Sequence, residues 1–335
     1  MNQTGMNRIG IIGGGAWGTA LAMAAGRAGR TALLWAREPE VVESINADHV
    51  NRLFLPGVTL DPAIAATGDL AAAAQSDALL LVTPAQHLRA AARALRLHLA
   101  ARTPVVICAK GIELESGLLL SEVLTAELPA TPYAVLTGPT FAIEVAKALP
   151  TAITLATADA AIGQALVNAL GGSRFRPYLS DDPIGAQVGG AVKNVLAIAC
   201  GVVEGRQFGD NARAALVTRG LAEMVRLGVA LGGKPETLMG LSGLGDLTLT
   251  CTSMQSRNTS LGVQLGQGRA LADILAERRS VAEGVTTARA VLDLAARLGV
   301  DMPIARAVKT LLDGSAGIDA VMEGLLARPF KTETQ

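Results

Sequence analysis

The chain has 335 residues, 50% hydrophobic and 17% charged, which suits a compact globular protein of two domains. Its 29 basic and 29 acidic residues balance, so no net basic field favours nucleic acid as a partner. Three cysteines and three histidines, all scattered, make neither a disulfide framework nor a metal site. We therefore expect a cytoplasmic protein without a metal, and without membrane insertion, since no apolar run past the N-terminus approaches the roughly 20 residues that span a bilayer.

The N-terminal segment combines an apolar strand, Arg8–Ile12, with a glycine turn and a helix that begins near Ala16. Gly13, Gly15 and Gly18 fill the three positions of the dinucleotide-binding fingerprint, which serve a tight turn, close approach of a pyrophosphate and helix–strand packing. The free N–H groups of the helix would hold the phosphates.

A secretory signal is the competing interpretation of this segment, with an apolar core from Ile9 to Ala25. Five glycines between Gly10 and Gly18 disfavour a stable apolar helix there.

The second predicted strand, Thr31–Trp35, leads to Arg37 and Glu38. A NAD-specific fold would place an acidic residue at the strand end to bind the ribose 2′-hydroxyl, whereas an arginine accepts the 2′-phosphate of NADP. Arg37 therefore predicts tolerance of, or preference for, NADP(H), and Glu38 could still serve NAD. The alternative is that Arg37 is a solvated loop charge.

Strands and helices alternate as far as about residue 181. The further predicted strands are Ala78–Thr83, Val105–Cys108, Tyr133–Leu136, Ile153–Ala156 and Phe175–Leu179, with helical patterns such as Gln86–Leu99 and Ser116–Glu127 between them. This alternation predicts an α/β fold, a Rossmann-like, doubly wound, mainly parallel sheet in residues 1–181. Ligands bind such sheets at the carboxyl ends of the strands, where the residues after 82, 108 and 137 lie.

Residues 182–335 show helical periodicity only, which predicts an all-helical, substrate-binding C-terminal domain with the site between the two domains. The expected helices are Pro183–Val203, Asn211–Leu231, Ser256–Gly266, Glu283–Leu298, Pro303–Asp313 and Ala316–Leu326.

Lys193 lies in the first of these helices, on the same face as the adjacent Gly189 and Gly190. Each interior glycine costs about 1 kcal/mol relative to alanine, which suggests the close approach of a backbone or a ligand. A lysine desolvated there would have a lowered pKa and could exchange protons near neutrality. The alternative is a lysine that snorkels over apolar surface.

A second glycine-rich turn, near residues 243–245, presents Asp246, and Ser256, Arg257 and Asn258 open the next helical segment. An arginine, an amide and a helix N-terminus make a plausible phosphate site. The alternative is a helix with a capping serine and an exposed arginine.

Taken together, these residues closely resemble bacterial NAD(P)-dependent glycerol-3-phosphate dehydrogenases from Ile9 to about Pro303. The resemblance rests on GGGAWGTALA (13–22), NRLFLPG (51–57), AKGIE (109–113), TGPTFAIEVA (137–146), GGAVKNVLAIACG (189–201), NARAALVTRGLAEM (211–224), GLGDLTLTC (243–251), QSRN (255–258) and VAEG (281–284). It implies reversible reduction of dihydroxyacetone phosphate to sn-glycerol 3-phosphate with NADP(H) and/or NAD(H), which supplies glycerophospholipid synthesis. It also implies a helical domain similar to that of 6-phosphogluconate dehydrogenase, and a homodimer is expected from the family only.

The resemblance further implies site residues. Lys193 matches the general acid/base, and Lys110 and Asn194 would stabilise or orient the reacting oxygen. The implied substrate positions are Lys110, Gly138, Thr140, Lys193, Asp246, Ser256, Arg257 and Asn258. The implied cofactor positions are Gly13, Gly15, Ala16, Trp17, Gly18, Arg37, Lys110, Ala142, Arg257, Val281 and Glu283. Ala16 departs from the family, which often has Ser or Thr there, so one hydroxyl contact to the pyrophosphate is missing.

Two other functions fit parts of the sequence. A 3-hydroxyacid or 6-phosphogluconate-type dehydrogenase shares the overall plan, but in that family an asparagine follows the catalytic lysine one helical turn later, where this chain has Ala197. A redox-sensing protein that holds NADP(H) without turnover would need neither Lys193 nor a second phosphate site.

Overall fold

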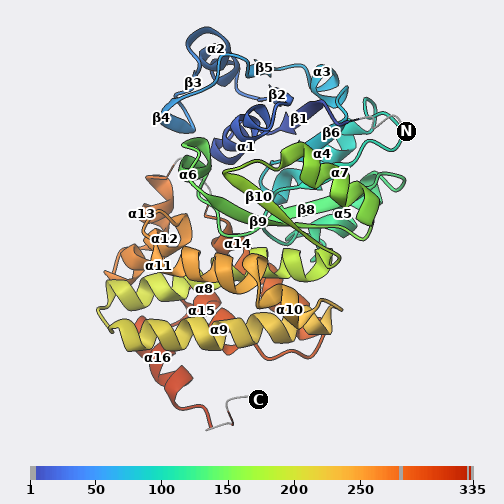
Figure 1. Cartoon of the computed structure of the whole chain (residues 1–335). Coiled ribbons are helices and arrows are strands. Elements are labelled where there is room, and N and C mark those ends of the chain that lie inside the picture. Colours follow the sequence, from blue (N-terminus) through green and yellow to red (C-terminus); the bar gives the residue numbers. More distant parts are fainter. Residues whose placement is uncertain (1–4, 279–281, 330–331, 333–335) are drawn as a thin grey trace.

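The central element of the structure, a computed structural model that describes residues 5–278, 282–329 and 332, is an eight-stranded sheet (Figure 1). The strand order is β10-β9-β8-β7-β6-β1-β2-β5, and neighbours are parallel except for the antiparallel pair β8 and β9. The strands are β1 (Arg8–Ile12), β2 (Thr31–Trp35), β5 (Ala65–Thr67), β6 (Ala78–Leu81), β7 (Val105–Ile107), β8 (Tyr133–Thr137), β9 (Thr151–Ala156) and β10 (Phe175–Ser180). The chain order reverses between β1 and β6, so the crevice at their carboxyl ends is the expected place for a dinucleotide.

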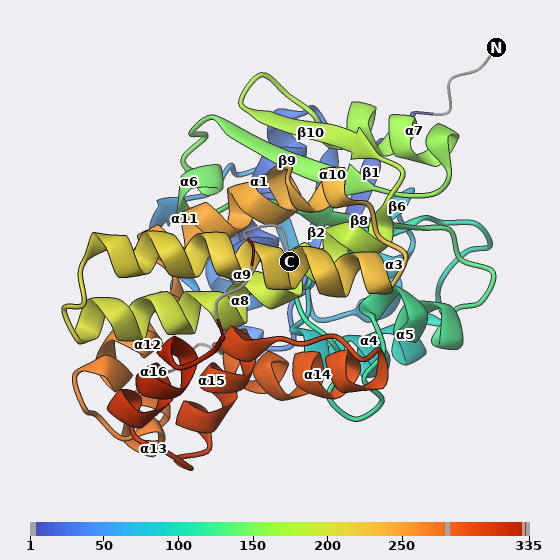
Figure 2. The ribbon, with the colours of Figure 1, turned by 90° about the horizontal axis from the view of Figure 1, so that it is seen from below.

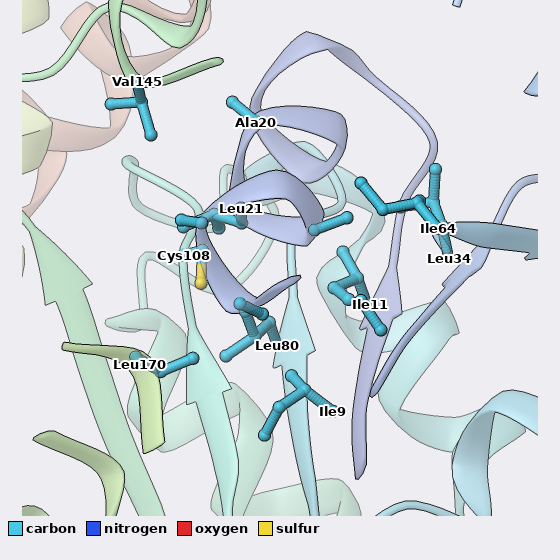
Figure 3. Close-up of a cluster of buried hydrophobic side chains, with 14 of the residues drawn as sticks. Ile9, Ile11, Ala20, Leu21, Leu34, Ile64, Leu80, Cys108, Val145 and Leu170 are labelled. Atoms are coloured by element: carbon cyan, nitrogen blue, oxygen red, sulfur yellow. The ribbon is translucent and has the colours of Figure 1, made fainter. Parts of the chain in front are cut away.

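Short helices cover the faces of this sheet. They are α1 (Ala16–Arg27), α2 (Pro39–Asp48), α3 (Leu70–Ala74), η1 (Ala85–His87), α4 (Leu88–Leu95), α5 (Leu120–Glu127), α6 (Ala142–Ala146) and α7 (Ala160–Leu170), and a small hairpin joins β3 (Val50–Asn51) to β4 (Leu55–Thr59). Figure 3 shows Ile9 and Ile11 of β1, Leu80 of β6 and Leu21 of α1 within one cluster of buried apolar side chains. Residues 9–12 of β1 and all of β6 are buried, as expected for strands covered on both faces, and these runs are continuously apolar.

Helices alone form the rest of the described chain. They are α8 (Pro183–Gly205), α9 (Asp210–Ala230), α10 (Pro235–Leu238), the π-helical turn η2 (Leu241–Gly245), α11 (Asp246–Thr252), α12 (Arg257–Gly266), α13 (Leu271–Ala276), α14 (Glu283–Arg297), α15 (Pro303–Leu312) and α16 (Ile318–Leu326). Figure 2 shows α8 and α9 side by side. A separate apolar cluster, centred on α8, is the core of this helical region.

Helix α8 corrects the expectation that no apolar run past the N-terminus is long enough to span a bilayer. It is 23 residues long, and its most apolar window has a mean hydropathy of 1.5, so length and composition alone would let it span a bilayer. However, 89% of that window is buried against the protein, which is the burial of a core helix. Its glycines permit this packing, because a Cβ on Gly201 would lie 2.2 Å from the carbonyl oxygen of Thr259 in α12.

The strands and long helices expected from periodicity are all present, with ends that differ by a few residues. Strand β5 and the β3–β4 hairpin were not expected. These segments are short and contain proline and glycine in β4, so they lack the apolar run that identifies a buried strand.

Candidate active site

A buried carboxylate, Asp246, binds two lysines at the junction of the sheet and the helical region. Its Oδ2 lies 2.6 Å from Lys110 Nζ and its Oδ1 lies 2.7 Å from Lys193 Nζ. Asp246 is fully buried, and the side chains of Lys110 and Lys193 are 14% and 7% exposed. Two ammonium groups on one carboxylate give the site a net positive charge, which suits an anionic substrate.

Three elements bring these charges together. Lys110 follows β7, Lys193 lies in the middle of α8, and Asp246 is the first residue of α11. Helix α8 fits closely against η2, because a Cβ on Gly189 would lie 2.3 Å from the carbonyl oxygen of Ser242. The glycines around Lys193 therefore allow the close approach of a backbone, and that approach places Asp246 beside the lysine.

Lys193 is held in a defined direction. Its Nζ donates to Asp246 Oδ1 and, at 2.7 Å, to Thr250 Oγ1, one turn further along α11. An ammonium has three N–H groups, so a third remains for another acceptor. Burial lowers the pKa of Lys193 to about 8, and the charge of Lys110 acts in the same direction, while Asp246 opposes both. Near neutrality this lysine can both give and take a proton.

The loop that carries Lys110 is tied on both sides. Gln86 Nε2 donates to the Ile112 carbonyl and its Oε1 accepts from Leu114 N–H, both at 2.9 Å. From α4, Arg89 pairs with Glu113 at 2.6 Å and holds the pKa of that carboxyl below its usual value. From α14, the Arg297 guanidinium donates to the Gly117 carbonyl at 2.8 Å.

Lys110 itself is also fixed by the chain end of β8. Its Nζ donates to the Gly138 carbonyl at 2.9 Å, and Thr140 Oγ1 donates to the same carbonyl at 3.2 Å. The resemblance alone implied Gly138 and Thr140, and these contacts place both beside Lys110.

An amide chain links α8, α12 and α14. Asn258 Nδ2 donates to Asn194 Oδ1 at 3.0 Å, and Asn258 Oδ1 accepts from Gly284 N–H at 3.0 Å. Ser256 caps α12 by accepting from Thr259 N–H, and the exposed Arg257 is the first helical residue. The sequence left open a phosphate site or a capped helix with an exposed arginine, and the geometry contains the elements of both.

The glycine turn after β1 has the features of a pyrophosphate cradle. Gly13 has φ +131°, and a Cβ on Gly18 would lie 1.9 Å from the Gly13 carbonyl oxygen, so both positions require glycine. A Cβ on Gly15 would meet nothing within 4 Å, so the space above the turn is open. Within the described residues, the N–H groups of Gly14 and Gly15 have no protein acceptor. These features fit a dinucleotide phosphate.

Four side chains near the proposed cofactor and substrate elements end in a buried polar atom without a hydrogen-bond partner in the described chain: Trp17, Thr83, Thr137 and Thr287. Thr83 and Thr137 lie at the carboxyl ends of β6 and β8, a position that could have identified them from sequence. The Thr137 hydroxyl lies near the Lys110 side chain, because a Cβ on Gly190 would lie 2.8 Å from that hydroxyl and 3.4 Å from Lys110 Cγ.

The remaining residues implied by the resemblance are dispersed around this crevice. Arg37 pairs with Glu38 at 2.9 Å, and its side chain is 79% exposed. Ala16 and Trp17 begin α1, and Ala142 begins α6. Glu283 begins α14, and burial raises its pKa while the positive charge of Arg257 opposes this shift. Val281 lies outside the described residues.

Two regions of the chain match one enzyme family. Residues 8–162 match the N-terminal model of NAD-dependent glycerol-3-phosphate dehydrogenase, and residues 182–323 match the C-terminal model. A glycerol-3-phosphate dehydrogenase [NAD(P)+] of Rhodospirillum rubrum is 61% identical over 334 residues, with coverage of 99% of this chain and 95% of the relative. The chain belongs to the NAD-dependent glycerol-3-phosphate dehydrogenase family.

Other members of this dehydrogenase family support the same assignment. The glycerol-3-phosphate dehydrogenase [NAD(P)+] of Parvibaculum lavamentivorans is 57% identical over 98% of each chain. The crystal structure of glycerol-3-phosphate dehydrogenase from Coxiella burnetii superposes with a TM-score of 0.92 at 39% identity, over 96% of this chain and 99% of that one. The resemblance found in the sequence is therefore confirmed, together with the Rossmann-like sheet and helical C-terminal region.

Proposed function

We propose that Lys193 is the general acid/base with which this NAD(P)-dependent glycerol-3-phosphate dehydrogenase interconverts dihydroxyacetone phosphate and sn-glycerol 3-phosphate. The single observation that carries the assignment is the buried Lys193 ammonium, held by Asp246 and Thr250 with one N–H left over. The family assignment supplies the overall reaction, and the geometry supplies a group that can move its proton.

In the reducing direction, the bound nicotinamide supplies a hydride for C2 of the ketone. Lys193 donates a proton to the oxygen that becomes the alcohol, and in the reverse direction neutral Lys193 removes it. Lys110 adds a second positive charge beside that oxygen, and Asn194 orients it. Asp246 is not a proton donor in this scheme, because it keeps both ammonium groups in place.

The substrate phosphate is proposed to bind at the start of α12. Arg257 supplies a charge, Asn258 supplies an amide, and Ser256 caps the helix whose positive end faces the phosphate. Gly138 and Thr140 line the opposite side of the same pocket. Binding of this remote phosphate would position the carbonyl at Lys193.

The cofactor is proposed to lie across the carboxyl ends of β1 and β6. Gly13, Gly15, Ala16, Trp17 and Gly18 would surround its pyrophosphate. The other proposed cofactor residues are Arg37 at the ribose, then Lys110, Ala142, Arg257 and Glu283, and also Val281, which lies outside the described residues. In this scheme residues 1–181 supply most groups for the cofactor and residues 182–335 supply most groups for the substrate.

Replacement of the proposed acid/base tests this function. Lys193→Ala should lower kcat by about 10³-fold, since it removes general acid/base catalysis, with the Kd for NADPH unchanged within about twofold. Lys234→Ala removes an exposed, ion-paired lysine and is the control. Turnover is followed as loss of nicotinamide absorbance on addition of dihydroxyacetone phosphate. Near-normal turnover of Lys193→Ala would refute the assignment, and wild-type protein that binds NADPH without turnover would be a redox sensor.

The small-molecule substrate follows from the family, whereas a homodimer and a cytoplasmic location are proposals that rest on the family expectation. The three cysteines are buried and free, which is consistent with a reducing compartment. Size-exclusion chromatography with light scattering tests the dimer, since a measured mass equal to that of one chain would exclude it.

A further inference from the structure

The motif NRLFLPG (51–57) has no place in the scheme above, yet its first residue touches the glycine turn. Asn51 ends β3 and is fully buried. Its Nδ2 donates to the Gly14 carbonyl and to Thr19 Oγ1, both at 2.8 Å. Its Oδ1 accepts from Phe54 N–H at 3.0 Å, which fixes the amide within its own hairpin turn.

These contacts hold two consecutive peptide groups of the turn. The Gly14 carbonyl is bound by Asn51 directly. The Gly15 carbonyl accepts from Thr19 Oγ1 at 3.0 Å, and that hydroxyl is the one that Asn51 binds. Asn51 and Thr19 are both fully buried, so water does not replace either contact.

The direction of a carbonyl decides the direction of the next N–H. No peptide bond in the described chain is cis, and in a trans peptide the C=O and the following N–H point to opposite sides. A Gly14 carbonyl held toward Asn51 therefore turns the Gly15 N–H away from the hairpin. In the same way, a Gly15 carbonyl held toward Thr19 turns the Ala16 N–H away from Thr19.

The aimed N–H groups face the open side of the turn. The Gly15 N–H has no acceptor in the described chain, and the space above Gly15 is empty within 4 Å of a Cβ position. A glycine residue can adopt many φ and ψ values. A turn of three glycines therefore needs contacts that fix its backbone if its N–H groups are to point to one place. Ala16 lacks the hydroxyl that would otherwise bind a phosphate, which leaves the N–H groups as the main donors there.

We propose that Asn51, directly and through Thr19, is a positioning residue that aims the N–H groups of Gly15 and Ala16 at the cofactor pyrophosphate. This inference rests on the proposed cofactor site. It assigns to the β3–β4 hairpin a function in cofactor affinity, with no contact between Asn51 and the cofactor.

Two fragments of the cofactor separate this effect from a general loss of structure. ADP-ribose contains the pyrophosphate, whereas adenosine 2′-phosphate lacks it and carries only the phosphate expected at Arg37. Asn51→Ala should weaken ADP-ribose about tenfold as an inhibitor competitive with NADPH, the effect of losing roughly one aimed hydrogen-bond donor. Adenosine 2′-phosphate should bind within twofold of its wild-type affinity, and kcat at saturating NADPH should be unchanged.

Asn46→Ala is the matched control. Asn46 also braces backbone in the sheet domain, because its amide exchanges hydrogen bonds of 2.9 and 2.8 Å with Ala66, but it does not touch the glycine turn. It should lower the melting temperature without changing the ratio of the two inhibition constants. Thr19→Val should raise the ADP-ribose constant as Asn51→Ala does, and Thr19→Ser, which keeps the hydroxyl, should restore it.

The outcomes separate the inference from the site on which it rests. If wild-type enzyme does not bind ADP-ribose, both are overturned. If wild-type enzyme binds it and Asn51→Ala is unchanged, or weakens both fragments equally, the positioning function alone is overturned. Should Asn51→Ala fail to fold, Thr19→Val and Thr19→Ser test the positioning function instead. The quantity compared is again the ratio of the inhibition constants of ADP-ribose and adenosine 2′-phosphate.

Discussion

The glycine turn after β1 and the charged cluster around Asp246 are built in opposite ways. At the turn, the donors are backbone N–H groups, and the side chains that matter stand behind them. At the cluster, backbones come close at glycines, and charged side chains with little exposure are the proposed catalytic groups. Phosphate binding needs several fixed donors of modest strength, whereas proton transfer needs one group with an adjusted pKa.

This comparison predicts that removal of the Asp246 charge lowers kcat/KM more than loss of one hydrogen-bond donor at the glycine turn weakens cofactor binding. Asp246→Asn leaves the buried Lys193 and the half-buried Lys110 without their shared counterion, so kcat/KM should fall about 10²–10³-fold. The Kd for NADPH should change little. Asp182→Asn is the control, because Asp182 is also a buried carboxylate but caps α8 by accepting from Gly185 N–H. Equal losses in kcat/KM for the two variants would contradict the special position of Asp246.

The cofactor region should show a smaller and more selective effect. Arg37→Ala should raise the KM for NADPH about tenfold and leave that for NADH within about twofold, since a charge-assisted contact to the 2′-phosphate is lost. Arg52→Ala removes a comparable exposed ion pair, that with Asp48, and should change neither. Equal KM changes for the two cofactors would show that Arg37 does not select between them.

The smallest expected effect concerns the pH dependence of Lys193. Reduction needs the protonated lysine, so its rate should fall as pH rises through about 8, and oxidation should rise over the same range. Thr250→Val removes an acceptor that favours the ammonium, so both midpoints should move to lower pH. Thr252→Val alters an exposed hydroxyl on the same helix and is the control. Unmoved midpoints in Thr250→Val would mean that another group controls the profile.

Sequence patterns identified the fold more readily than the site. Strands such as β1 and β6 are buried on both faces, so their apolar runs are unambiguous, whereas β5 has three residues and little such signal. Lys193 was conspicuous because a lysine is rare in an apolar helix. The contacts that hold it were not visible in this way, because Asp246 and Thr250 lie 53 and 57 residues further along the chain.

Asn51 is a second residue whose contacts could not be predicted from the sequence. Nothing in the pattern of residues 51–57 indicates that its amide meets a carbonyl 37 positions earlier, because that contact depends on how a hairpin folds back over α1. Ala16 illustrates the reverse case, since the resemblance to the family already indicated from the sequence that a hydroxyl is missing there.

The salt bridge between Lys110 and Asp246 divides the proposed reaction centre between two regions of the chain. Lys110 lies in a loop of the sheet domain, and Asp246 lies in the helix that follows the π turn, so each charge depends on the other region for its partner. A gene fusion that gave this helical region a different nucleotide-binding half would keep Lys193 and Asp246 but lose the second ammonium. At this contact the sheet and the helical region are therefore constrained to change together.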